Sequence, residues 1–70
     1  MNVDELRVEL ARRNISIPEL ADKIGIGKKS LYQRFKKETQ FKQNEILKIK
    51  EILHLSNERV MEIFFSPNVS

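Results

Sequence analysis

The stretch from Ser16 to Phe35 constrains the fold most, because it contains two short apolar-patterned segments separated by a turn that contains glycine. Ser16 and Glu19 have the three-residue spacing of a capping box, which satisfies free amides at a helix N-terminus. A helix is therefore predicted to begin near Ile17. Gly25 stands where a helix favours a residue with positive φ just past its end, so this helix is predicted to stop there.

The apolar residues of this first segment recur at helical spacing. Leu20, Ala21 and Ile24 lie three and four residues apart, which places them on one inward-facing stripe. Alanine suits the contact line between two helices that cross at a steep angle, where a bulky side chain would push them apart. Ile26 is expected to fold back as the apolar plug of the turn.

A second helix is predicted from Lys28 to about Lys36, with Leu31 and Phe35 one turn apart on its buried line. At about 100° per residue, the opposite side of this helix is basic, bears an amide and has no acidic residue. Lysine can donate to guanine O6 or N7, and glutamine can pair with adenine N6 and N7, so this face is suited to base edges in the DNA major groove. The residues on or beside it are Lys29, Ser30, Tyr32, Gln33 and Lys36.

Residues 21–31 resemble the helix-turn-helix of the Cro and CI phage repressors, the lambda-repressor-like family. The resemblance lies in the run Ala-Asp-Lys-Ile-Gly-Ile-Gly, which starts at Ala21, and in Leu31 four residues after it. The similarity is densest over residues 16–35 and extends in helix count to nearly the whole chain. The expected fold is all-α, a compact bundle of five short helices in which the second and third form a helix-turn-helix. The function that the resemblance implies is a sequence-specific, double-stranded DNA-binding transcriptional regulator, a repressor that acts by occupying its operator.

In that family, the second helix of the pair reads bases from its N-terminal half. The resemblance therefore places base-reading roles on Lys28, Lys29 and Gln33, with Ser30 and Tyr32 as further contacts to a phosphate or a thymine methyl group.

Two positions depart from the family pattern. Ile17 stands where a polar residue, often glutamine, helps to hold a phosphate, so only its backbone amide can serve there. Arg34 stands at the usually apolar position three residues after Leu31, and Phe35 is expected to take over the packing.

The segment after Phe35 has no apolar anchor until Phe41, so residues 36–40 are predicted to form a loop that Phe41 pins to the core. In the family, this loop and the start of the next helix lie along the sugar-phosphate backbone. The candidates for phosphate contacts are the Ile17 amide, Lys36, Lys37, Lys42, Gln43 and Asn44.

Positive charge is concentrated in the middle of the chain. Residues 1–22 hold three basic and five acidic residues, a net charge of −2, and residues 51–70 hold one basic and three acidic residues, also −2. Residues 23–50 hold nine Lys or Arg against two Glu, a net charge of +7. A charge run can be merely a solvated face, but the acidic flanks favour a surface that meets phosphates.

Further helices are predicted from about Val3 to Arg13, from about Gln43 to Leu53 and from about Asn57 to Phe65, with Leu47 in the core-facing band of the second of these. Residues 1–66 are expected to form one domain, and residues 67–70 a short C-terminal tail. The last helix has more apolar surface than one face can hide. Its Met61, Ile63 and Phe65 either close the core or form a patch through which two copies pair. A homodimer would place two reading helices about one DNA turn apart on a palindromic operator.

The composition excludes several classes of function. The chain has no cysteine, and its one histidine, His54, is expected to cap a helix or lie on the surface, so no metal site and no cofactor are expected. No nucleophile-base pair or phosphate-cradling glycine loop is present, so an enzyme is not expected. The chain has neither an apolar run of membrane-spanning length nor a signal peptide at its N-terminus, which predicts a cytoplasmic protein without a membrane partner.

A protein-binding module is the main alternative. Small helix-turn-helix proteins of phage regions can act as antirepressors or antitoxins, gripping another regulator through the apolar C-terminal helix. The helix predicted over residues 28–36 is a poor candidate for a protein-binding surface, because its outward residues include lysines and lysine is depleted in the cores of protein-protein interfaces.

Overall fold

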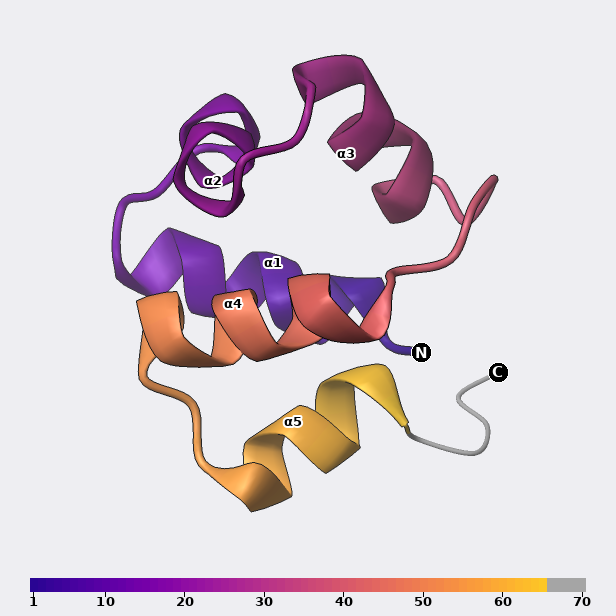
Figure 1. Ribbon diagram of the computed structural model, residues 1–70. Helices are drawn as coiled ribbons and strands as arrows, with labels where there is room; N and C mark the ends of the chain where they lie inside the picture. The colour runs from indigo at the N-terminus through magenta and orange to yellow at the C-terminus, as the bar shows by residue number, and fades with distance from the viewer. Residues whose placement is uncertain (66–70) are drawn as a thin grey trace.

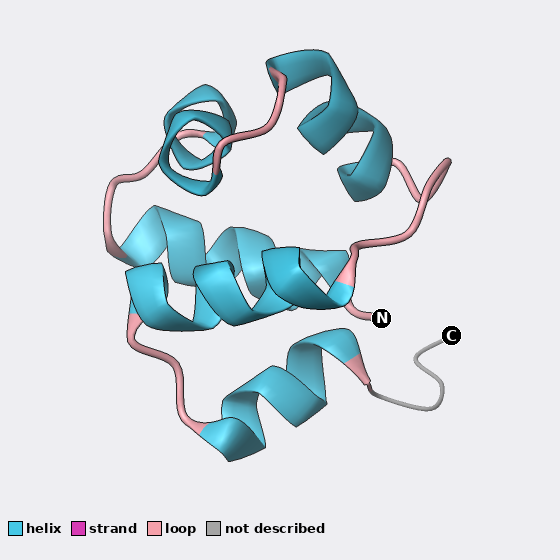
Figure 2. Cartoon of the chain, viewed as in Figure 1, coloured by secondary structure: helices cyan, strands magenta, loops and turns pink. Residues whose placement is uncertain are grey.

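The computed structural model describes residues 1–65, which fold into five α-helices without a strand (Figures 1 and 2). The helices are α1 (Val3–Arg12), α2 (Ile17–Ile24), α3 (Lys28–Phe35), α4 (Gln43–Leu53) and α5 (Asn57–Phe64). The all-α prediction is confirmed, and every predicted helix boundary agrees within one residue. The expected tail, residues 67–70, lies outside the described residues. None of the helices in residues 1–65 is long and apolar enough to cross a membrane.

Short polar side chains cap the N-termini of three of the helices. The Ser16 Oγ accepts a hydrogen bond from the Glu19 amide at 3.1 Å, which confirms the predicted start of α2. Asn2 and Ser56 cap α1 and α5 in the same way, each accepting from the amide three residues later. Because each cap occupies one amide that has no intrahelical acceptor, the ends of these short helices are stabilised locally.

Two helices end at a residue in the left-handed region. Gly25 has φ 78° and its amide donates to the Ala21 carbonyl at 2.9 Å, as the sequence predicts for the end of α2. His54 has φ 55° and ends α4, which confirms its expected capping position. The turn after Gly25 leads directly into α3, and α2 and α3 share more contacts than any other pair of described helices.

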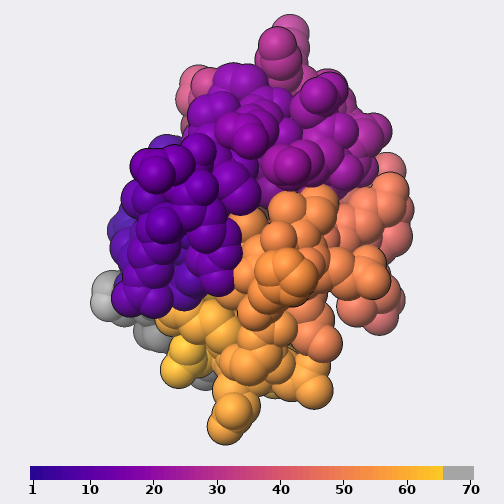
Figure 3. All heavy atoms as spheres, turned by 90° about the vertical axis from the view of Figure 1, so that its left-hand side faces the viewer, coloured from indigo at the N-terminus to yellow at the C-terminus, as the bar shows by residue number. Residues whose placement is uncertain are grey.

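The helices are arranged in three tiers (Figure 1). The α1 and α4 helices cross the middle of the molecule, α2 and α3 lie above them, and α5 lies below. In the space-filling view, the atoms of the first two helices meet those of α4 and α5 (Figure 3). Every helix contributes to one core, whose fully buried large side chains are Leu6, Leu20, Ile24, Leu31, Ile49, Leu53 and Ile63. The prediction for Leu47 is wrong: this residue lies on the flank of α4 and is exposed.

A row of phenylalanines anchors the loop between α3 and α4. The Phe41 ring makes edge-to-face contacts with Phe35 on α3 and with Phe64 on α5, at centroid distances of 6.0 and 5.5 Å. The expected pinning of the loop by Phe41 is therefore confirmed, and it also ties α3 to α5. The Arg7 guanidinium of α1 lies over the Phe35 ring, 5.1 Å from its centroid.

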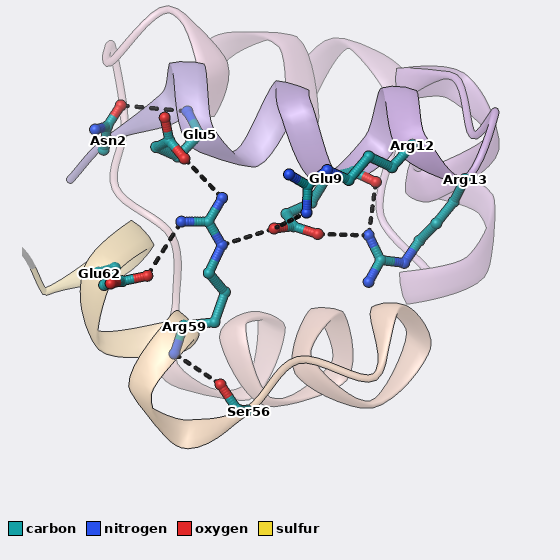
Figure 4. Close-up of polar contacts among 8 residues, drawn as sticks. All are labelled: Asn2, Glu5, Glu9, Arg12, Arg13, Ser56, Arg59 and Glu62. Carbon is teal, nitrogen blue, oxygen red and sulfur yellow. Dashed lines mark hydrogen bonds and ion pairs between the residues drawn. The ribbon is translucent and has the colours of Figure 1, made fainter.

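An ion-pair network joins α1 to α5 (Figure 4). Arg59 donates to Glu5 and to Glu9 at 2.6 Å each, and to Glu62 at 3.1 Å. The Glu9 carboxylate also accepts from Arg13 at 2.6 Å and lies 3.8 Å from the Arg12 guanidinium, so this buried acid has three cationic partners. Local spacing could not predict the link between Glu9 and Arg59, because these residues are 50 positions apart.

Candidate nucleic-acid interface

The candidate base-reading residues all lie on the first six positions of α3. Lys28, Lys29 and Tyr32 are exposed, and Ser30 and Gln33 are partly exposed. Leu31 and Phe35 are buried on the opposite side, as predicted. The helix therefore presents lysines, an amide and a phenol to solvent while its apolar side is held in the core.

The candidate phosphate-contact residues stand in three segments of the chain. Lys36 and Lys37 follow its C-terminus, and Lys42, Gln43 and Asn44 stand at the start of α4. All five are exposed. The amide of Ile17 is the first of α2, where a backbone N–H has no acceptor within its own helix. The Ile17 side chain is partly buried against the core and has no polar group, so the backbone N–H is the group that can donate to a ligand.

A buried ion pair that the sequence pattern did not predict connects α3 to the start of α4. The Arg34 Nε donates to Glu45 Oε1 at 2.7 Å and Nη2 donates to Oε2 at 3.0 Å, so the pair is bidentate. The two side chains are only 10% and 5% exposed. Phe35 is buried as expected, but the charged residue beside it is buried as well.

Two backbone groups complete this pair. Arg34 Nη1 donates to the Ser30 carbonyl at 3.0 Å, one turn back on α3. The Lys42 amide donates to Glu45 Oε1 at 2.9 Å, which closes the N-terminus of α4. Ser30 and Lys42 are both candidate DNA contacts, so the ion pair links the two halves of the candidate interface.

The buried carboxylates remain ionised because of their partners. Burial alone would raise the pKa of Glu45, but hydrogen bonds from Arg34 and the Lys42 amide outweigh it and lower that pKa below its ordinary value of 4.5. The hydrogen bond from Arg13 lowers the pKa of Glu9, and Arg59 adds to this effect against the desolvation caused by burial. Hydrogen bonds to Glu5, Glu9 and Glu62 raise the pKa of Arg59, which is therefore charged throughout the accessible pH range.

These lowered pKa values predict that the fold loses stability in acid. A carboxyl group whose pKa is lower in the folded than in the unfolded chain stabilises the fold above its ordinary pKa, and this contribution is lost as protons bind. We therefore expect the free energy of unfolding to be constant near neutral pH and to fall as the pH drops below about 4.5. Urea unfolding followed by circular dichroism between pH 7 and pH 3 measures this dependence. Glu9→Gln serves as the comparison, and its pH dependence should be shallower than that of the native chain; identical slopes would contradict the prediction.

The exposed apolar patch on α5 is smaller than the sequence suggests. Met61 and Phe65 are 57% and 52% exposed and lie one helical turn apart. Ile63 is 0% exposed, so its predicted place in a dimer interface is wrong. The reason is angular: two residues correspond to about 200°, which turns Ile63 from the Met61 side into the core. Glu58 and Glu62 are the exposed acids on the outward side of the same helix.

Of the five described helices, α3 is the one without an acidic residue, whereas the other four carry charges of both signs. The α3 helix contains no acid, and in the stretch from α3 to the start of α4 the buried Glu45 is neutralised by Arg34, which leaves Glu38 as the exposed acid. The acids of α1 and α5 include Asp4, Glu5, Glu9, Glu58 and Glu62. An anionic ligand would therefore be attracted to the side of the molecule formed by α3 and the loop after it.

Comparisons with protein-family models, curated proteins and solved structures find no match to this chain. Within residues 1–65, no group of three His, Asp or Glu side chains is placed to hold a metal ion. The function is therefore inferred from the exposure and charge of α3 and of the segments beside it.

Proposed function

We propose that this protein is a sequence-specific, double-stranded DNA-binding transcriptional regulator, a phage or prophage repressor of the Cro/CI type. In this proposal α2 and α3 form a helix-turn-helix, and the protein acts in the cytoplasm by occupying an operator, without catalysis or a cofactor. One observation carries the proposal: α3 exposes Lys28, Lys29 and Tyr32, with Gln33 beside them, on an acid-free face that is supported from behind by buried apolar residues.

The α3 helix would lie in the major groove, where each base pair presents a distinct pattern of donors and acceptors. Lys28 and Lys29 would donate to guanine O6 or N7, and the Gln33 amide would pair with adenine. Lys36, Lys37 and Lys42, on the loop and at the start of α4, would bind phosphates on the groove wall and fix the position of α3.

Two copies would bind a palindromic operator. Met61 on α5 and Phe65 at its C-cap are exposed, and we propose that they contact their counterparts across a two-fold axis. Such a dimer would place its two α3 helices about 34 Å apart, one turn of DNA. Glu58 and Glu62 on the same side of α5 would have to lie at the rim of this contact, because like charges at its centre would repel.

The salt dependence of duplex binding tests the proposal. Each phosphate neutralised by a lysine contributes about −0.9 to the slope of log K against log salt concentration. With Lys36, Lys37 and Lys42 engaged, we expect a slope of roughly −3 for a monomer and about −5 for a dimer. Fluorescence anisotropy with a labelled random duplex at several salt concentrations gives this slope, and selection from a random pool of duplexes should return a two-fold symmetric site.

A pair of charge-matched variants controls for net charge. Replacing Lys36 and Lys37 by alanine should reduce the slope by about 2 per monomer. Replacing Lys48 and Lys50 by alanine removes the same charge from α4, away from its N-terminus, and should leave the slope almost unchanged. Equal losses in both variants would show that binding follows overall charge and that no defined phosphate surface exists.

The exposed α5 patch favours a second candidate, a modulator that binds another regulator through Met61 and Phe65. The same titration separates the two functions. A protein-binding module should show almost no affinity for duplex at any salt concentration, and no duplex should be enriched from the random pool.

A further inference from the structure

The Arg34–Glu45 pair occupies an unusual place, between the two surfaces that the proposed function assigns to bases and to phosphates. Arg34 extends from the buried side of α3, and Glu45 lies in the first turn of α4. Seven residues, 36–42, separate the two helices along the chain. Of these, Phe41 is packed against the core, whereas the lysines that precede it are exposed.

The pair fixes the distance between these surfaces through a continuous set of hydrogen bonds. The bonds run from the Ser30 carbonyl to Arg34, from Arg34 to both carboxylate oxygens of Glu45, and from Glu45 to the Lys42 amide. A guanidinium and a carboxylate joined by two parallel bonds have a defined relative orientation as well as a defined distance. The start of α4 therefore cannot slide along α3 without breaking one of these bonds.

We propose that Arg34 and Glu45 are positioning residues that set the register between the base-contacting face of α3 and the phosphate-contacting start of α4. The inference rests on the proposed function and specifies how that interface discriminates between sequences. Base contacts made by short, directional hydrogen bonds require α3 to sit at one depth and angle in the groove. Lysine contacts to phosphate tolerate small shifts, because the charge is carried on a flexible stem.

The chemistry of the pair supports a role in geometry more than in stability. A buried ion pair often adds little net stability, because removing two charges from water costs about as much as their attraction returns. Leu or Met in these positions would fill the same space without that cost. An apolar contact would not, however, hold the Ser30 carbonyl, the carboxylate and the Lys42 amide in one arrangement.

The test compares two substitutions that preserve charge. Arg34→Lys keeps the positive charge but removes the bidentate contact with Glu45. The matched control, Arg59→Lys, makes the same change in the α1–α5 network, remote from α3. For each folded variant, anisotropy measures the affinity for the duplex selected by the native chain and for random duplex, at several salt concentrations. Circular dichroism establishes the temperature range in which each variant is folded.

We expect Arg34→Lys to reduce the ratio of selected-site to random-duplex affinity at least tenfold, with unchanged random-duplex affinity and salt slope. Arg59→Lys should leave the ratio within about twofold of the native value. An unchanged ratio in folded Arg34→Lys would overturn the proposal.

If this variant does not fold, the double replacement Arg34→Met with Glu45→Leu, which leaves no buried charge unpaired, is measured by the same criterion. If the native chain itself selects no site and shows no salt-dependent duplex binding, the proposed function fails, and the positioning role fails with it.

Discussion

Replacing Arg59 by methionine is expected to lower the free energy of unfolding by about 3 kcal/mol, the lower end of the range for breaking a buried ion pair. The guanidinium bonds to three carboxylates at once, and one of these, Glu9, is 5% exposed. Without Arg59, the Glu9 carboxylate keeps the hydrogen bond from Arg13 and the longer contact with Arg12, both from the C-terminal end of α1. Because Arg59 itself is 22% exposed, water would compensate part of the loss.

This loss is large for a chain of this size. A domain of 70 residues has a total stability of roughly 3.5–10 kcal/mol. The variant would therefore lose roughly 30% or more of that stability. Its unfolding transition, followed by circular dichroism at 222 nm, should move to a clearly lower urea concentration at pH 7.

Glu62→Gln is the matched control, because it weakens a bond in the same network at an exposed position. The Glu62 side chain is 65% exposed, and exposed ion pairs contribute about 0–1 kcal/mol. Similar losses from both substitutions would contradict the conclusion that the buried contact between α1 and α5 dominates this network.

The helices could be predicted from the sequence because their determinants are local. The Ser16 and Glu19 pair, the positive φ at Gly25 and the apolar periodicity of α2 each act within a few residues. The exposed face of α3 could be predicted in the same way, because the burial of Leu31 and Phe35 determines which side chains of the helix point outward.

The ion pairs could not be predicted, because they depend on where separate helices meet. Arg34 lies one turn after Leu31, and Glu45 lies one turn before Ile49, so each is a charge on an otherwise core-facing line. Two opposite charges at core-facing positions of neighbouring helices are the sequence feature from which their pairing could have been predicted. The error at Ile63 has a similar origin: the sequence gives α5 excess apolar residues, but the packing of α1 and α4 against it decides which of them are covered.

The largest expected effect on DNA binding is that of Gln33→Ala. A bidentate amide contact to adenine is worth about 1–3 kcal/mol of discrimination, so affinity for the selected operator should fall roughly 5- to 150-fold. Operators substituted at the base pair that Gln33 reads should lose much less, because the native chain already lacks that contact on them. Affinity for random duplex and its salt slope should not change.

Lys37→Ala is the comparison, and it should behave in the opposite way. Lys37 is exposed after the end of α3, where it can meet a phosphate, which carries no sequence information. Its φ of 65° does not complicate the comparison, because lysine and alanine both have a Cβ atom and tolerate that conformation similarly. This variant should bind all duplexes more weakly by a common factor, with a salt slope reduced by about 1.

Anisotropy titrations of both variants against a panel of single-base operator variants separate the two patterns. Equal losses on every duplex for both variants would contradict the assignment of base reading to α3 and of phosphate binding to the loop that follows it.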